Sequence, residues 1–496
     1  METLISIKPL LAVLVSAIAA VLVMLSYRRP NLREGWSLGA GVIKFLIVVS
    51  MTPVILSGGI IQYTVFKILP GVELAFKVDG IGLLFATTSS FLWIITTVYS
   101  MGYMRTLEEH AQTRYYTCFA IALSSAMGVA FAGNLFTLFF FYEILSLCTL
   151  PLVIHNEGAK DWDAGRKYLL YLVGASSSIL LGAIILTYTL TGTLDFNKAG
   201  MFSGLTATTF SGMEIATLLT VMYFMFLYGF AKAGLMPMHN WLPSAMVAPT
   251  PVSALLHAVA VVKVGAFCIV RLVTDVFGVP LMQNLHLGDY TAIIASITIL
   301  ASSAYALTQD NLKMRLAYST VSQLSYIVLG VALLTGNGII GGIIHIVNHA
   351  VTKITLFFCA GSIYVASHKT NISQMSGIAR KMPWTIAAFT IASLSIIGVP
   401  LFAGFITKWH IAIGTIETKS WVLLGVLLTS SLLNVAYFAP VVYKAVFGTP
   451  PEDGHEGISE APLKVLVPLL ITAAGTVVLG IFPDHFLNLI KVGLLR

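Results

Sequence analysis

Charged residues and cysteines are scarce in this chain of 496 residues. Only 10% of the residues are charged, against about 25% in a typical soluble domain, whereas 57% are hydrophobic and the mean hydropathy is +0.90. Such a composition indicates that lipid surrounds most of the folded chain. The net charge of +7 is spread over short loops without a basic run, so it does not indicate a nucleic-acid partner.

The four cysteines, Cys118, Cys148, Cys268 and Cys359, each lie alone in an apolar stretch. There is no CxxC pair for an iron-sulfur cluster or a zinc site, and no glycine-rich nucleotide turn. We therefore expect no cofactor, no metal site and no redox chemistry in the chain itself, and we expect the cysteines to pack as small apolar residues. An oxidoreductase subunit with its own redox centre is a competing hypothesis that lacks these signatures.

Apolar stretches of about 20 residues, the length of a membrane-spanning helix, recur along the chain. We place about 14 of them, at 7–27, 40–61, 81–101, 115–133, 135–154, 168–190, 215–236, 250–274, 289–308, 317–335, 338–366, 385–412, 421–447 and 463–487. The first is too long for a signal peptide and is followed by Arg28, Arg29 and Pro30 without a small-residue cleavage site. The pattern predicts an all-α polytopic membrane protein.

The lysines and arginines of the loops are distributed unevenly. Loops after even-numbered spans hold only Lys67, Lys77, Lys198 and Lys419, whereas loops after odd-numbered spans hold many more. Because cytoplasmic loops are enriched in these residues, the odd-numbered loops are predicted to be cytoplasmic. Both termini are then expected on the non-cytoplasmic side of the cell membrane.

Five charged residues, Glu143, Lys232, Lys263, Lys353 and Lys408, interrupt otherwise apolar spans. A charge near the bilayer centre costs on the order of 3 kcal/mol, so such residues favour a functional interpretation. Together they predict a path for ions through the membrane.

Two of these lysines lie beside predicted helix breaks. In span seven Lys232 precedes Pro237 and Pro243, and in span twelve the sequence GVPLFAG precedes Lys408. Proline removes a backbone hydrogen bond, and the freed carbonyls are tolerated only inside protein or beside a water-filled cavity. Ordinary proline kinks with lysines reaching toward the membrane surface are the alternative, but Lys232 has apolar residues on both sides.

Paired interrupted spans at corresponding positions are typical of transporters built from inverted repeats. The broken span is the fourth of five in each of two units, 114–274 and 288–447. An odd number of helices per unit requires the second unit to be inverted. Helices one to three (1–110) precede the units, and a loop with helix fourteen (448–496) follows them.

The remaining ionisable residues extend the predicted path. A buried carboxylate stays ionised when it faces a lysine, and the nearest candidate for Glu143 in its unit is Lys232. His345, His349 and Lys353 follow one another at four-residue intervals on one helical stripe, which indicates a proton relay. Two histidines at this spacing also suit a metal, but no acidic or cysteine ligand lies nearby in the sequence.

Two further histidines are secondary candidates. His257 shares span eight with Lys263, but six residues turn a helix by about 600°, so the two side chains point to different faces. A hydrogen-bonded structural role for His257 is an equal alternative. His239 lies between the two prolines after Lys232.

The segments AKAGLMPMHNWLPSAMVAPTPVSALLHA, DNLKMRLAYSTVSQLSYIVLG, HIVNHAVTKITLFFCAG and IGVPLFAGFITKWH carry a family resemblance. The chain resembles, from about 75 to 447, the antiporter-like subunits of respiratory complex I, the A and D subunits of Mrp-type cation/proton antiporters, and related subunits of membrane-bound hydrogenases. The resemblance implies a relay of charge along a mid-membrane axis. It assigns to that relay the helix-five glutamate, Glu143, and the residues Lys232, Lys263, His345, His349, Lys353 and Lys408.

The compact chain, with a lysine in span twelve and no long lateral helix, resembles most a D-type Mrp subunit. The alternative is a proton-pumping membrane subunit of a complex I-like NADH dehydrogenase or a hydrogenase. Expected partners are homologous antiporter-like subunits, small membrane subunits, lipid, protons and Na⁺. Ser244 departs from the family, where many relatives carry an acidic residue. A stand-alone transporter of an organic solute is a third hypothesis, but no pocket signature for a larger solute is present.

Overall fold

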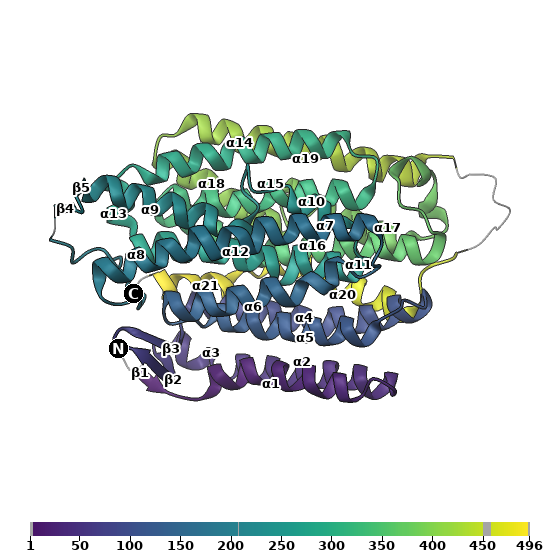
Figure 1. Ribbon diagram of the computed structural model, residues 1–496. Coiled ribbons are helices and arrows are strands. Elements are labelled where there is room, and N and C mark those ends of the chain that lie inside the picture. Colours follow the sequence, from purple (N-terminus) through teal and green to yellow (C-terminus); the bar gives the residue numbers. More distant parts are fainter. Residues whose placement is uncertain (1–2, 207, 450–457, 495–496) are drawn as a thin grey trace.

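The computed structural model describes residues 3–206, 208–449 and 458–494. Long helices lie side by side in an elongated bundle, with the two ends of the chain at the same end of it (Figure 1). Each of the predicted spans contains a helix, which confirms a polytopic, mainly helical membrane protein. Ten of the described helices are long and apolar enough to cross a membrane, and Ile215–Gly229 and Pro383–Ile397 are shorter apolar helices.

The N-terminal part contains a small sheet that the sequence did not predict. Its elements are β1 (Thr3–Ile5), α1 (Lys8–Leu25), α2 (Pro30–Val49), α3 (Thr52–Leu56), β2 (Ile60–Leu69), β3 (Val72–Val78) and α4 (Gly80–Thr106). Strand β2 pairs parallel to β1 and antiparallel to β3. The predicted span 40–61 was therefore wrong at both ends, because Pro30 starts the helix and the β-branched run from residue 60 joins the sheet.

The next part contains the first predicted five-helix unit. Its elements are α5 (Gln112–Ala130), α6 (Leu135–Val153), α7 (Ala159–Leu169), η1 (Leu170–Gly174), η2 (Ser176–Leu180), α8 (Leu181–Thr191), β4 (Thr209–Phe210), β5 (Met213–Glu214), α9 (Ile215–Gly229), η3 (Ala231–Ala233), α10 (Trp241–Ser244), η4 (Ala245–Val247), α11 (Thr250–Ala254), η5 (Leu255–Val259), α12 (Val261–Arg271) and η6 (Leu272–Phe277). The helix of span seven is broken as predicted, but it ends at Gly229, so the break begins before Lys232 and not at Pro237.

The second unit and the C-terminal part follow. Their elements are α13 (Val279–Asn284), α14 (Leu287–Thr308), α15 (Leu312–Ala332), α16 (Gly336–Ser367), η7 (Ile372–Gln374), η8 (Ile378–Arg380), α17 (Pro383–Ile397), α18 (Ala403–Glu417), α19 (Trp421–Phe447), α20 (Leu463–Ile481) and α21 (Asp484–Leu494). Span twelve is divided into α17 and α18, and Gly398 between them has a φ of +92°, which favours glycine. The predicted span 463–487 was too long, because α20 ends before Pro483.

Burial separates the central helices from the peripheral ones. The most apolar windows of the helix α16 and of the helical segment Thr250–Phe277 are completely buried, whereas that of α19 is only 28% buried. Both buried elements lie in the middle of the bundle (Figure 1). They carry Lys263, His345, His349 and Lys353, so these polar side chains are shielded by protein on all sides. The inverted relation of the two five-helix units stays a prediction.

Candidate functional site

Lys232 lies in the helix break and contacts α6. Its side chain is fully buried, and its Nζ donates to the carbonyl of Tyr142 at 3.0 Å and to Ser146 Oγ at 2.6 Å. The ammonium also lies over the Tyr142 ring, 3.1 Å from the ring centroid. The break thus places a lysine beside the residues that flank Glu143 on α6.

Glu143 does not form the direct ion pair that we expected. Its Oε1 is buried without a hydrogen-bond partner among the described residues, and no ion pair within 4.0 Å joins it to Lys232 there. The Lys232 amine instead contacts Tyr142 and Ser146, one residue before and three residues after Glu143 on α6. Glu143 and Lys232 therefore lie near one another where Lys232 contacts α6, without an ion pair between them.

Helix α12 packs closely against the break and carries the next lysine. A Cβ on Gly265 would lie 2.2 Å from the backbone nitrogen of Ala233 and 2.8 Å from Lys232 Cβ, so only glycine fits there. One half-turn earlier, Lys263 is 1% exposed, and its Nζ is hydrogen-bonded to His349 Nδ1 on α16. The contact brings together two candidates that the sequence placed in different units.

The histidine stripe on α16 continues from this contact toward α18. The rings of His345 and His349 stack with centroids 5.5 Å apart. His345 Nδ1 is hydrogen-bonded to Thr407 Oγ1 at 3.1 Å, and its ring lies 5.7 Å from that of Tyr326. The Nε2 atoms of both histidines are buried without a protein partner in the described chain. The two histidines of the predicted stripe therefore form a stacked pair that ends at Thr407, the residue before Lys408. Lys353, the third member of the stripe, is not part of this stack.

Lys408 lies in α18, just after the second break, and reaches back to it. Its Nζ donates to the carbonyl of Ile397 at 2.7 Å and to Ser431 Oγ at 2.8 Å, and it lies 5.5 Å from the centroid of the Tyr326 ring. A Cβ on Gly398 would lie 2.6 Å from Lys408 Cδ. The absence of a side chain at this glycine gives the lysine room to reach the carbonyl at the end of α17.

Lys353 belongs to a second connection. Its Nζ donates to Ser319 Oγ at 2.9 Å and to the carbonyl of Leu316 at 3.3 Å. Ser319 is hydrogen-bonded to the hydroxyl of Tyr437, which donates in turn to Asn434 Oδ1. The amide of Asn434 donates to the carbonyl of Ile396, next to the carbonyl that Lys408 contacts. This polar chain therefore leads from Lys353 to the same helix break.

Not every candidate joins these connections. His257 is completely buried, but neither ring nitrogen has a hydrogen-bond partner in the described chain, and its ring packs 5.1 Å from that of Phe357. His239 is half-buried, and its Nδ1 is likewise without a partner among those residues. The structure thus joins Lys263, His349 and His345 by direct contacts and leads Lys353 and Lys408 to the same helix break. It leaves Glu143, Lys232 and both secondary histidines outside these connections.

A fifth buried lysine was not predicted. Lys44 on α2 is completely buried, donates to the carbonyl of Leu123 at 3.0 Å and lies 4.6 Å from the Trp93 ring centroid. Lys44 lies within the predicted apolar span 40–61, as the other buried lysines lie within theirs, so the same sequence signal identifies it.

A buried cluster of four charges was also missed. Arg271 Nη1 and Nη2 contact the two oxygens of Asp79 at 2.6 and 2.7 Å, Arg271 Nη1 contacts Asp275 at 3.1 Å, and Lys198 contacts Asp275 at 2.8 Å. Burial opposes the ionisation of Asp79, but the charges of Arg271 and Lys198 outweigh it and hold the pKa of Asp79 well below its usual range. The spacing of Arg271 and Asp275 was a visible signal, since i and i+4 share a helix face.

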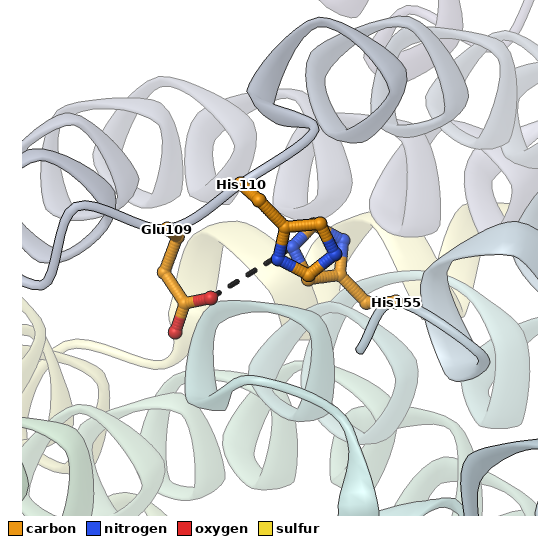
Figure 2. A group of neighbouring side chains, drawn as sticks. All are labelled: Glu109, His110 and His155. Atoms are coloured by element: carbon orange, nitrogen blue, oxygen red, sulfur yellow. Dashed lines mark ion pairs between the residues drawn. The ribbon is translucent and has the colours of Figure 1, made fainter. Parts of the chain in front are cut away.

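A third group lies in two loops at the end of the bundle. Glu109 and His110 follow α4, and His155 follows α6 (Figure 2). Burial, with the nearby charges of His110 and Arg114, lowers the pKa of His155 to about 4, and burial raises the pKa of Glu109. Glu109 also lines a cavity of about 240 Å³, together with Thr250 and Lys313. No spacing in the sequence predicts this group, because its members come from two separate loops.

The comparisons with known proteins agree with this architecture. Residues 132–434 match the family described as NADH:quinone oxidoreductase/Mrp antiporter, TM. NADH-quinone oxidoreductase subunit N of Desulforudis audaxviator is 33% identical over 80% of both chains. A probable K⁺/H⁺ antiporter subunit of the A/B type from Rhizobium meliloti is 30% identical over 93% of this chain but only 46% of its own, so this chain spans about half of that relative.

The fold is also found in a solved complex. The structure of the Mrp complex from Dietzia sp. DQ12-45-1b contains a chain that matches with a TM-score of 0.85 and 21% identity, covering 99% of this chain and 97% of that one. At this identity the match shows the fold alone. From the family match and the identity to the first relative, the chain belongs to the NADH:quinone oxidoreductase/Mrp antiporter transmembrane family, as its motifs predicted.

Proposed function

We propose that this chain translocates protons through the membrane as the D-type antiporter-like subunit of an Mrp-like complex, with exchange for Na⁺ or another monovalent cation. The observation that carries the proposal is the buried row Lys263–His349–His345, which ends beside Lys408. Imidazoles both donate and accept protons near neutral pH, and lysines deliver protons when their environment permits. A row of such groups in the interior of a membrane protein is suited to proton relay.

The environment of the lysines supports the same function. Lys232, Lys353 and Lys408 each donate to one backbone carbonyl and one serine hydroxyl, and none of them has an ion-pair partner among the described residues. A serine hydroxyl donates to a neutral amine as readily as it accepts from an ammonium. These pockets therefore accommodate both protonation states, which a relay requires.

A second candidate is a proton-pumping membrane subunit of a complex I-like NADH dehydrogenase or a hydrogenase. The 33% identity to an NADH-quinone oxidoreductase subunit N favours it. Both candidates use the same internal row and differ in the partner subunits. Mass spectrometry of the complex purified through this chain separates them, because only the second candidate requires subunits that carry redox centres.

The row is tested by interrupting its central contact. His349→Phe removes the imidazole that links Lys263 to His345 but keeps a ring of similar size, so proton transport into everted vesicles is expected to fall at least about tenfold. His257→Phe is the matched control, since His257 is equally buried but outside the row. Subunit content is checked by blotting. Normal transport by His349→Phe, or an equal loss in His257→Phe, contradicts the proposal.

A further inference from the structure

The three side chains Glu109, His110 and His155 form a compact donor group apart from the proton row. Figure 2 shows the carboxylate of Glu109 pointing toward the two imidazoles, which overlap in this view. One ligand atom from each residue lies within 4.8 Å of the others. The two rings have centroids 4.7 Å apart, and His155 Nε2 lies 3.9 Å from Glu109 Oε2.

The buried member of the group lacks the partners that a structural histidine normally has. His155 has no exposed surface, and neither of its ring nitrogens makes a hydrogen bond of normal geometry in the part of the chain that the structure describes. A buried polar group without a partner is costly, and such groups are commonly bound to an ion or a water molecule. The ring of His155 is therefore placed to ligate rather than to support the fold.

The surrounding contacts hold the group in position. The guanidinium of Arg114, on α5, donates to the carbonyl of His155 at 2.8 Å and forms an ion pair with Glu157. The ion pair with Glu157 partly offsets the positive charge of Arg114 near the group. His110 is exposed, Glu109 is half-buried and His155 is buried, which gives an ion a path from solvent to the innermost ligand.

We propose that Glu109, His110 and His155 bind a divalent transition-metal ion, with Zn²⁺ as the best fit. Two imidazoles and one carboxylate are the protein ligands of open zinc sites, in which a water molecule takes the fourth position. Calcium and magnesium prefer oxygen ligands and are not expected to bind. In a tetrahedral site with bonds of about 2.1 Å the ligand atoms lie about 3.4 Å apart, so the side chains close by about 1 Å around the ion. The exposed His110 in its loop provides this movement.

The site is tested with Zn²⁺ alone, on the full chain purified within its complex and treated with chelator. The wild-type chain is expected to bind Zn²⁺. His110→Ala and Glu109→Gln are each expected to weaken the affinity for Zn²⁺ at least about tenfold, because each removes a ligand. Because His110 is exposed, His110→Ala is expected to fold normally. The test therefore remains informative even if His155→Ala, at the buried ligand, does not fold. The control is His368→Asn, which removes an exposed histidine at a position with a φ of +55°.

The result is read by calorimetric titration and by X-ray absorption at the zinc edge. We expect zinc bound by two nitrogens of imidazole and one carboxylate oxygen, with binding unchanged in His368→Asn. Equal affinity in wild type, His110→Ala and Glu109→Gln would overturn the proposal, and so would absence of binding to wild type at micromolar Zn²⁺. Transport activity is not the readout, so the outcome is independent of the function proposed above.

Discussion

Replacing Asp79 with asparagine tests the buried charge cluster that fixes α12 in the bundle. Asp79 caps α4 by accepting from the backbone nitrogen of Gly82 at 2.8 Å, and it accepts two bonds from Arg271 on α12. The side chains of Arg271 and Asp79 are 4% and 12% exposed, so solvent screens their interaction little. Asp79, Asp275, Arg271 and Lys198 together have no net charge, and the substitution leaves one positive charge in excess.

The expected loss follows from these contacts. Removing one partner of a buried ion pair costs about 3–5 kcal/mol, because the other charge remains buried. The introduced asparagine would keep one acceptor oxygen for Arg271 or for the helix cap, so we expect a loss of about 3 kcal/mol in the free energy of unfolding. Asp79→Ala also removes the cap and is expected to lose about 1 kcal/mol more.

The assay is denaturant unfolding of the purified protein in mixed micelles. The control is Glu73→Gln, whose partner Lys67 lies 3.9 Å away with 81% of its side chain exposed, so its loss is expected to stay below about 1 kcal/mol. Adding Arg271→Met to Asp79→Asn restores neutrality, and the double variant is expected to be more stable than Asp79→Asn alone. Two results would contradict a stabilising ion pair between Asp79 and Arg271. One is a free energy of unfolding for Asp79→Asn within about 1 kcal/mol of wild type, and the other is a loss in the double variant equal to the sum of the losses of Asp79→Asn and Arg271→Met.

The same cluster predicts a pH dependence. Because the folded pKa of Asp79 is lowered, its contribution to stability is complete above the unfolded pKa of about 3.9 and is lost as the pH falls toward the folded pKa. The difference between wild type and Asp79→Asn is therefore expected to be constant from pH 7 to about pH 5 and to shrink below about pH 4.

Substitutions at three positions test the proton path, each by cation/proton exchange in everted vesicles with subunit content checked by blotting. Glu143→Gln is expected to abolish exchange without loss of assembly, since it removes a buried carboxylate that has no hydrogen-bond partner at Oε1 among the described residues, and near-normal exchange would exclude Glu143 from the path. Lys232→Arg keeps the charge but does not release a proton, so it is expected to assemble and fail to transport at any pH; robust transport would limit Lys232 to an electrostatic role. Lys408→Ala is expected to stop transport, whereas Lys408→Glu keeps a titratable group at the same depth and is expected to retain part of it; normal transport by the alanine variant would remove Lys408 from the path.

Much of the fold was readable from the sequence because membrane helices are specified by composition. Apolar length predicted the helices, and proline and glycine predicted the breaks beside Lys232 and Lys408. The sheet of β1, β2 and β3 was not predicted. Its strands are as apolar as the adjoining helices, and only pairing with distant residues decides their conformation.

The contacts among the candidate site residues were only partly predictable from the sequence, and their roles stay predictions. Spacing placed His345 and His349 on one face of a helix, and that pair does stack. The contact of Lys263 with His349 joins residues far apart in the sequence, so no local period encodes it. The expected ion pair of Glu143 with Lys232 does not form, because the amine instead reaches the carbonyl of Tyr142 and the hydroxyl of Ser146 on the same helix.

The two kinds of buried charge in this protein differ in what holds them. In the Asp79–Arg271 cluster every charge faces an opposite one, so the protonation states are fixed and the contacts serve the structure. Lys232 and Lys408 face carbonyls and hydroxyls instead, partners that tolerate both an ammonium and an amine. Helix breaks supply or make room for those partners, since the carbonyl of Ile397 lies at the end of α17. The breaks therefore place Lys232 and Lys408 against partners that suit both protonation states, which is what the proposed relay requires.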